Sequence, residues 1–329
     1  ANASLYPLEL RLSPQIREKW WQSALVAARQ LKNLADEACA LSNLMAIHTD
    51  MGDARRAITE GERAVQILKE LGKPTLASPA LNNMGLAYEA LNEPLRAIEF
   101  YEESLRIDRE LGDRRGEAAA LANIGNCHST LHEMRLAIEF HERARDIYRT
   151  AGYRLGEARS LGNLGNDCVA IGQFGRAVEH FEQELKVLQD LGDKGEMART
   201  YVNLGSVCIH LEQPTRSIQY SNDALSLARE IDDRRLEAKA LGNLGLAWAG
   251  LGEVRRSIEF YKNQLTITCE VRDRHDEGTA LWNLGQAHYT LGERANAVSL
   301  AEAALKIRED MKDPDADKIR RKLAEWKST

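Results

Sequence analysis

A pentapeptide of the form Leu-x-Asn-Leu-Gly returns along this chain at a fixed interval of forty residues. Its seven copies are LSNLM at Leu41, LNNMG at Leu81, LANIG at Leu121, LGNLG at Leu161, YVNLG at Tyr201, LGNLG at Leu241 and LWNLG at Leu281. The spacing never slips, and a fixed period of this length is the sequence signature of a solenoid. We therefore expect one continuous array, in which each repeat packs only against its neighbours.

Each repeat predicts a hairpin of two amphipathic helices. In the fourth repeat, Leu161 and Leu164 recur at helical spacing, and Phe181, Leu185 and Leu188 do so again after a short interruption. The residue expected at the turn between the two helices varies along the chain: Gly52, Asn92, His132, Gly172, Glu212, Gly252 and Gly292. This variety indicates that the position requires a turn and not a particular ligand-binding loop.

Two small positions predict that the helices of a repeat approach each other closely. Glycine inside a helix costs about 1 kcal/mol relative to alanine, so a glycine that recurs there indicates a close contact. The first helices carry Gly85, Gly125, Gly165, Gly205, Gly245 and Gly285, and the second helices carry Ala57, Ala97, Ala137, Ala177, Ser217, Ser257 and Ala297. The first repeat has Met45 in place of the glycine, which is consistent with an atypical terminal unit.

The charged residues between repeats are those expected at helix ends. Several second helices end in a sequence such as LGDRR, from Leu111 to Arg115, whose glycine accounts for the end of the helix. An acidic residue follows in the first turn of the next helix, where it suits the helix dipole: Glu117, Glu157, Glu237 and Glu277. We therefore assign these charges to helix capping and not to binding.

A first helix of the form Leu-Gly-x-x-Tyr/His/Trp, followed by a second helix of the form small-x-x-hydrophobic, resembles the tetratricopeptide repeat. The ordinary repeat has about 34 residues, so the forty-residue spacing is closer to the long-repeat type of kinesin light chains, Pins-type adaptors and the sensor arms of bacterial STAND-type signalling ATPases. The proline usual at the end of a repeat is missing from most units. The resemblance covers residues 20–311 and implies an all-α fold, a right-handed α-α superhelix of seven helical hairpins with capping helices at both ends.

We predict three parts along the chain. Residues 1–33 form an N-terminal extension and a half-repeat capping helix, in which Ser13 and Pro14 suit an N-cap and the first helical position. Residues 34–312 form the seven repeats. Residues 313–329 form a C-terminal capping helix, because Ile319, Leu323 and Trp326 lie on one stripe and charges lie elsewhere. Such caps keep the ends of a repeat array soluble.

Charge and cysteine content narrow the functional classes. The net charge of −6 argues against non-specific nucleic-acid binding, which needs a basic face. No apolar run is long enough to insert across a membrane. The five cysteines lack CxxC spacing, and Cys168 and Cys208 take the repeat position that Tyr88 and Trp248 take elsewhere. We expect these cysteines to be packing residues of a reduced, cytoplasmic protein.

No catalytic residue, metal site or cofactor is predicted. The chain has no GxxxxGK[ST] phosphate loop, and its GNLG sequences lie inside helices and not at a strand-to-helix turn. The eight histidines form no HExxH motif. His48 takes the large aromatic position of the repeat, where a packed residue is expected, whereas His141 and His180 are expected at the surface. We therefore predict that the protein is not an enzyme.

Asparagine occupies one identical position in all seven first helices: Asn43, Asn83, Asn123, Asn163, Asn203, Asn243 and Asn283. Asparagine is a mediocre residue for a helix interior because its amide competes for backbone groups, so this recurrence needs a cause. One explanation is a hydrogen bond that ties each repeat to its neighbour. The other is a ladder of amides that grips the backbone of an extended peptide. The resemblance implies the ladder, because this position faces the concave surface of long tetratricopeptide superhelices, and the two explanations are compatible.

Three successive repeats carry a cation one helical turn before the asparagine, at Arg159, Arg199 and Lys239. In a chain that is acidic overall, these cations would form a positive stripe for carboxylates, which arginine binds bidentately. The alternative is that they are solvated charges on a polar face. Three residues after the asparagine, Asn126 and Asn166 would extend the same groove.

These observations predict a non-catalytic scaffold that binds an extended, acidic segment of a partner protein in its concave groove. The candidate binding residues are Asn83, Asn123, Asn163, Asn203, Asn243, Asn283, Arg159, Arg199, Lys239, Asn126 and Asn166. The alternative is a ligand-sensing C-terminal arm of a bacterial STAND-type ATPase, with an upstream domain in the same polypeptide. The absence of an initiator methionine and the paired Trp20 and Trp21 near the start favour that alternative.

Overall fold

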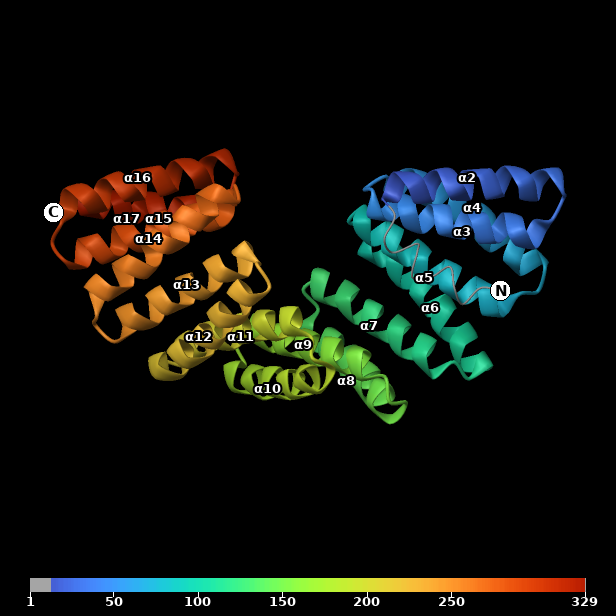
Figure 1. The fold of residues 1–329 in the computed structure, drawn as a ribbon, viewed down its shortest axis with the longest axis horizontal. Helices are drawn as coiled ribbons and strands as arrows, with labels where there is room; N and C mark the ends of the chain where they lie inside the picture. The colour runs from blue at the N-terminus through green and yellow to red at the C-terminus, as the bar shows by residue number, and fades with distance from the viewer. Residues whose placement is uncertain (1–12, 329) are drawn as a thin grey trace. The chain divides into compact units, whose positions relative to one another are not determined.

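The structure is a computed structural model that describes residues 13–328, and this part of the chain forms sixteen α-helices and no strand (Figure 1). An unpaired helix, α2 (Pro14–Gln30), precedes the repeats. The first helices of the seven repeats are α3 (Leu34–Asp50), α5 (Pro74–Ala90), α7 (Arg114–Thr130), α9 (Arg154–Ala170), α11 (Lys194–His210), α13 (Arg234–Gly250) and α15 (Arg274–Thr290). The second helices are α4 (Ala54–Glu70), α6 (Pro94–Leu111), α8 (Met134–Thr150), α10 (Phe174–Leu191), α12 (Pro214–Glu230), α14 (Val254–Glu270) and α16 (Arg294–Asp310). The last helix is α17 (Ala316–Ser328), and the predicted all-α array of hairpins is confirmed.

The turns follow one another at twenty-residue steps. From Lys32 to Lys312, every twentieth residue has a positive φ, whether it lies within a repeat or between two repeats. All seven predicted turn residues belong to this series, including the non-glycine Asn92 (φ 59°) and Glu212 (φ 56°). A left-handed residue at this point lets backbone N–H groups bond back to the last carbonyls of the helix. Helices α2 to α16 therefore end in the same way.

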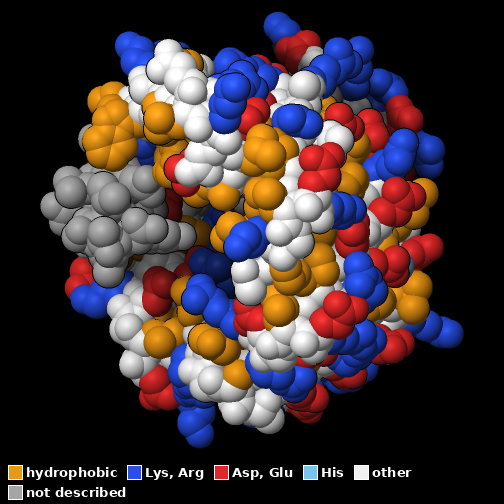
Figure 2. All heavy atoms as spheres, turned by 90° about the vertical axis from the view of Figure 1, so that its right-hand side faces the viewer, with side chains coloured by type: hydrophobic (Ala, Val, Ile, Leu, Met, Phe, Trp, Pro, Cys, Tyr) orange, Lys and Arg blue, Asp and Glu red, His pale blue; other side chains and the backbone are white. Residues whose placement is uncertain are grey.

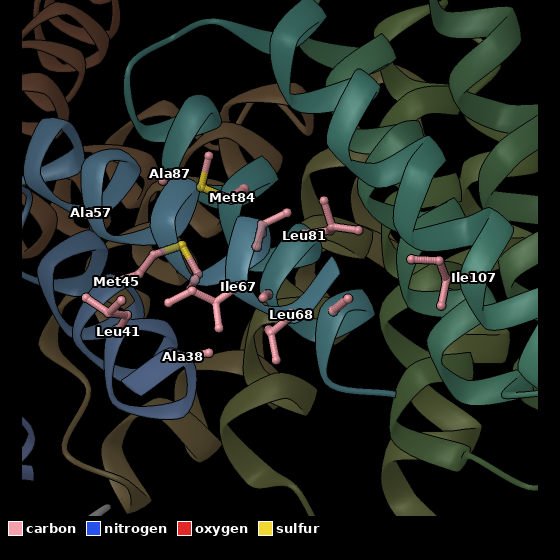
Figure 3. Packing of buried hydrophobic residues seen from close by; sticks show 14 residues of the cluster. Ala38, Leu41, Met45, Ala57, Ile67, Leu68, Leu81, Met84, Ala87 and Ile107 are labelled. Carbon is pink, nitrogen blue, oxygen red and sulfur yellow. The ribbon is translucent and has the colours of Figure 1, made fainter. Parts of the chain in front are cut away.

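The chain divides after Asp167 into two compact units, residues 1–167 and 168–329, which we call unit 1 and unit 2. Within each unit, successive helices pack against each other, from α2 to α8 in unit 1 and from α10 to α17 in unit 2. First helices also pack against the first helices of adjacent repeats, α3 on α5 in unit 1 and α11 on α13 in unit 2. Figure 3 shows part of the core of unit 1, where Met45, Ile67 and Met84 come from three successive helices.

Both small positions of the repeat lie where the helices meet, as predicted. The small residues of the second helices, from Ala57 to Ala297, are fully buried. A Cβ atom on Gly85 would lie 2.4 Å from the Tyr101 ring, and one on Gly245 would lie 2.3 Å from the Tyr261 ring. In these two repeats the glycine therefore makes room for an aromatic ring of the second helix, whereas Gly205 faces Ser221 and Gly285 faces the backbone of α16.

The charges between repeats do more than cap helices. Asp113 caps α7 as expected, because its Oδ1 accepts the Gly116 N–H at 2.9 Å. Glu117, however, is buried and pairs with two arginines, Arg109 of α6 at 2.9 Å and Arg114 at 2.6 Å. Equivalent triads are Arg149, Arg154 and Glu157, and Arg229, Arg234 and Glu237. Each triad joins the end of one repeat to the start of the next.

The helices at the two ends of the array are covered to different extents. In α2 only Ala28 is buried, and Trp20 is 52% exposed. In α17 the expected stripe is buried, and Trp326 stacks on Trp282 and Tyr289 with ring centroids 5.4 and 4.5 Å apart. Within residues 13–328, no helix combines the length and the apolar character that crossing a bilayer requires.

Candidate functional site

One face of each first helix is turned towards solvent and carries the predicted site residues. We call this face the first-helix strip and define it by the asparagine, the residue four positions before it and the residue three positions after it. On α9 the strip is Arg159, Asn163 and Asn166, of which Arg159 and Asn166 are exposed and Asn163 is half-buried. Residues at these intervals lie on one side of a helix. Each strip is therefore one continuous surface.

In unit 1, two ladder asparagines bond to the preceding repeat. The Nδ2 of Asn123 donates to the Oδ1 of Asn82 at 2.9 Å, and the Nδ2 of Asn163 donates to the Oδ1 of Asn126 at 2.9 Å. The side chain of Asn83 forms no hydrogen bond with any residue that the structure describes. Asn163 and Asn126, both predicted site residues, are thus in direct contact.

In unit 2, one ladder asparagine forms a hydrogen bond with the preceding repeat. The Nδ2 of Asn243 donates to the backbone carbonyl of Val202 at 2.8 Å, and Asn243 is only 9% exposed. Asn203 and Asn283 are half-buried, and their side chains form no hydrogen bond within residues 13–328. Repeat-to-repeat bonding therefore accounts for Asn123, Asn163 and Asn243. It leaves the recurrence of asparagine at the other positions unexplained.

A buried polar network lies directly behind the Asn126–Asn163 pair. The His141 ring is 1% exposed; its Nδ1 lies 2.7 Å from Oδ2 of Asp167, and its Nε2 lies 3.1 Å from Oδ1 of Asn126. Ser129 donates its hydroxyl to the other oxygen of Asp167 at 2.7 Å. The expectation that His141 lies at the surface is wrong. It is wrong because His141 takes the position of Tyr101, the ring that fills the niche beside the glycine of the repeat.

The prediction that His180 lies at the surface is also wrong. His180 of α10 is 8% exposed. His48, predicted to be a packed residue, is 1% exposed and contacts the carboxylates of Glu60 at 2.6 Å and Glu18 at 3.2 Å. Within residues 13–328 no group of three or more His, Cys, Asp or Glu residues is arranged to hold a metal ion.

The three predicted cations are all exposed but differ in their surroundings. Arg199 pairs with Glu196 on its own helix. Arg159 and Lys239 form no ion pair within residues 13–328, so their charges are available to an external anion. On the face of the molecule seen in Figure 2, by comparison, acidic and basic side chains are interspersed.

Two pockets of unit 2 adjoin its strips. One, of about 350 Å³, is lined by Ile209, Pro214, Leu246 and Gly250, so it lies beside the α13 strip and is mainly apolar. The other, of about 430 Å³, lies between α15 and α17. It is lined by Trp282, Gln286, Tyr289, Thr290, Lys318, Lys322 and Trp326. Strip residues Leu246 and Gln286 thus border concave surface.

Burial also changes the chemistry beneath the α11 strip. Glu184 of α10 is 4% exposed, and this burial raises the pKa of its carboxyl group to about 7, against the opposing effects of the Thr200 hydroxyl and the Arg199 charge. Sequence reasoning missed Glu184. Its repeat position is uncharged in the other repeats, where it holds Ala64, Ser104, Ala144, Ala224, Gln264 and Ala304, and an acid at this position was the available signal.

The repeats match a known family. Residues 36–110, 116–190 and 196–262 match one family model described as tetratricopeptide repeat, and residues 279–311 match a second model with the same description. No curated protein sequence gives a significant match to this chain.

Several solved structures are similar in fold. The Signal Transduction ATPase with Numerous Domains (STAND) protein with a tetratricopeptide repeat sensor from Pyrococcus horikoshii is 15% identical, with a TM-score of 0.68 over 94% of this chain and 50% of that chain. BtubC (BKLC) from P. vanneervenii is 20% identical, with a TM-score of 0.61 over 68% of this chain and 93% of that chain. A Rap protein complexed with competence and sporulation factor is 14% identical, with a TM-score of 0.55 over 96% of this chain and 97% of that chain. At these identities the likeness concerns the fold alone.

Proposed function

Because this chain belongs to the tetratricopeptide repeat family, we propose that it is a scaffold that binds an extended segment of a partner protein along its first-helix strips. It acts by holding the partner and not by turnover. The proposal includes a reduced, cytoplasmic setting, which suits five cysteines that form no disulfide. A solenoid suits this role because each repeat can offer one contact to a linear ligand.

The observation that carries the proposal is the repeated polar strip. Every first helix presents an asparagine beside solvent-facing positions, and Asn83, Asn203 and Asn283 keep amide groups without a partner in the described chain. An amide can both donate and accept, so it matches the alternating N–H and C=O groups of an extended backbone. The Rap protein complexed with competence and sporulation factor supports the proposal, since in that structure a protein of similar fold binds another molecule.

Acidic character of the segment is proposed from the charges on the strips. Arg159 and Lys239 lie one turn before Asn163 and Asn243 and lack an acidic partner in the described chain. A carboxylate of the partner beside each asparagine would form charge-assisted hydrogen bonds with these cations, which are stronger than neutral ones. The apolar pocket at Leu246 would hold an apolar side chain of the same segment.

An array of capped twelve-residue peptides, graded in acidic and apolar content, tests the proposal. We expect the whole chain to retain acidic peptides at low salt, and Arg159→Glu with Arg199→Glu to abolish the retention. Arg135→Glu is the matched control, because Arg135 is an exposed arginine of the second helix α8, off the strips. Peptide binding that is unchanged by salt and by both strip substitutions would contradict the acidic-segment proposal. If no peptide binds, the scaffold proposal is contradicted.

A second candidate function is a ligand-sensing arm of a STAND-type ATPase. It is favoured by the fold likeness to the STAND protein with a tetratricopeptide repeat sensor, of whose chain the match covers 50%. A nucleotide-binding domain encoded in the same reading frame upstream of residue 1 would support this function. A reading frame without one would contradict it.

A further inference from the structure

We propose that the buried pair of His141 and Asp167 positions the surface amide of Asn126, so that its N–H groups face a carboxylate of the bound segment. Asn126 then donates the hydrogen bond to the partner's carboxylate. His141 is a positioning residue that sets the orientation of the Asn126 amide. The inference rests on the proposed function, because it concerns the same strips in unit 1.

The ring of His141 is held in one orientation. Oδ2 of Asp167 lies 2.7 Å from its Nδ1, and the remaining oxygen of Asp167 accepts the Ser129 hydroxyl at 2.7 Å. Both carboxylate oxygens are thus occupied, and Asp167 is itself only 4% exposed. A buried carboxylate with these two contacts fixes the ring that it touches.

The fixed ring in turn selects one orientation of Asn126. Its Oδ1 lies 3.1 Å from Nε2 of His141 and accepts the Nδ2 of Asn163 at 2.9 Å. A His141 ring that is protonated at both nitrogens donates Nδ1–H to Asp167 and Nε2–H to this oxygen. The oxygen then uses its two lone pairs for His141 and for Asn163, whose Nδ2 also lies 3.3 Å from Nε2. The Nδ2 of Asn126 must therefore point away from His141. It has no acceptor within residues 13–328 and is not among the buried unpartnered atoms, so solvent reaches it.

A second unpaired donor lies on the same surface. Arg159 precedes Asn163 by one turn of α9, about 6 Å along the helix axis, and Asn163 is bonded to Asn126. Arg159 is exposed and unpaired in the described chain. Amide and guanidinium N–H groups that share a surface fit a carboxylate, which only accepts hydrogen bonds.

Packing alone does not require the buried pair. Where this repeat has His141 and Asp167, a later one has Tyr261 and Ala287, which belong to one apolar cluster. Buried ion pairs are often replaced by apolar residues without loss of stability. The polar pair occurs in the repeat where its ring contacts the amide of Asn126, whereas the equivalent Asn166 belongs to the repeat of Phe181 and Val207.

The test is a double-mutant cycle on the whole chain. The probe is the tightest-binding acidic twelve-residue peptide of the array, labelled with fluorescein and followed by anisotropy. His141→Tyr with Asp167→Ala copies the Tyr261–Ala287 pair, and Asn126→Leu copies Leu86 and Leu246 of other strips. We expect each change to weaken binding by about tenfold, which corresponds to one charge-assisted hydrogen bond.

The decisive result is the combination of both changes. If His141 acts through Asn126, the triple variant binds as weakly as either parent variant and no more weakly. If the losses of peptide affinity are independent and multiply in the triple variant, the inference is overturned. Full affinity of the His141→Tyr, Asp167→Ala variant would overturn it as well.

Circular dichroism checks that the variants fold. If the His141→Tyr, Asp167→Ala variant does not fold, His141→Phe with Asp167→Val, copied from Phe181 and Val207, replaces it. Failure of the wild-type chain to bind any peptide would overturn the proposed function and this inference with it, whereas wild-type binding with an unaffected graft overturns this inference alone.

Discussion

Gly85 and Tyr101 share one space between α5 and α6. The Tyr101 ring is fully buried, and a Cβ atom on Gly85 would lie 2.4 Å from its Cε1. In the first repeat the roles are exchanged, since Gly61 lies on the second helix and a Cβ there would lie 2.4 Å from Sδ of Met45. Met45 is therefore not a loss of the repeat pattern but half of a reciprocal change.

Gly85→Ala should destabilise the chain because the buried ring leaves no room for the added methyl group. Overpacking of this kind costs about 1–3 kcal/mol, and urea denaturation measures it. Gly175→Ala is the control, since that helical glycine has open space around it, and alanine should be neutral or stabilising by up to about 1 kcal/mol there. Equal effects at both positions would contradict the close contact.

Glu212→Gly should stabilise the chain. Glu212 has a φ of 56°, and a non-glycine residue pays about 1–2 kcal/mol for this conformation, partly offset by the flexibility that glycine adds to the unfolded chain. We expect a gain of up to about 1 kcal/mol in the free energy of unfolding from urea titration. A loss of stability would show that the Glu212 side chain contributes more than the turn.

Asn163→Ala and Asn203→Ala should differ in stability although they stand at the same repeat position. Asn163 bonds to the preceding repeat, and its loss should cost about 1 kcal/mol. Asn203 has no such bond in the described chain, so its replacement should leave the free energy of unfolding unchanged. Both should weaken peptide binding if the ladder holds the partner. A stability loss at Asn203 with intact binding would favour a packing role instead.

Glu184 should give the chain a measurable pH dependence. Burial raises the pKa of this carboxyl group from 4.5 to about 7, so the folded chain holds the proton more tightly than the unfolded chain. Its contribution to stability is present below about pH 4.5 and is lost as the pH rises to about 7, on the order of 3 kcal/mol.

Glu184→Gln should remove this dependence, because glutamine does not titrate. The substitution should be tolerated, because Gln264 already occupies the same repeat position in a buried setting. Urea titrations at pH 5 and pH 8 should show that the variant loses less stability than the wild-type chain between the two. An identical change in both proteins would contradict the raised pKa.

The fold could be predicted because its determinants are local and repeat. Helix periodicity, the glycines and the turn residues each recur in sequence, and every predicted turn adopts the positive φ that ends a helix. The prediction for Met45 as an atypical residue was also correct in kind. Its exchange with Gly61 depends on which side chains face each other across two helices, and spacing alone does not reveal that.

The sequence predicts which helices carry the candidate residues, but it does not predict the contacts among them. The sequence places Asn126 and Asn163 on first helices, yet their hydrogen bond joins residues 37 apart. His141 was predicted at the surface, whereas its ring is buried in the space beside Gly125 of the facing helix. Burial of Glu184 and pairing of Glu117 likewise depend on neighbouring repeats.

The uniform step of the turns also bears on how such a chain can change over generations. Because a left-handed residue recurs every twenty positions from Lys32 to Lys312, duplication or excision of one whole hairpin joins ends that already match. Excision of a single helix would instead leave a second helix where a first one belongs, and would bring two unlike faces together. Recombination in multiples of a hairpin therefore changes the number of first-helix strips without requiring a new kind of junction.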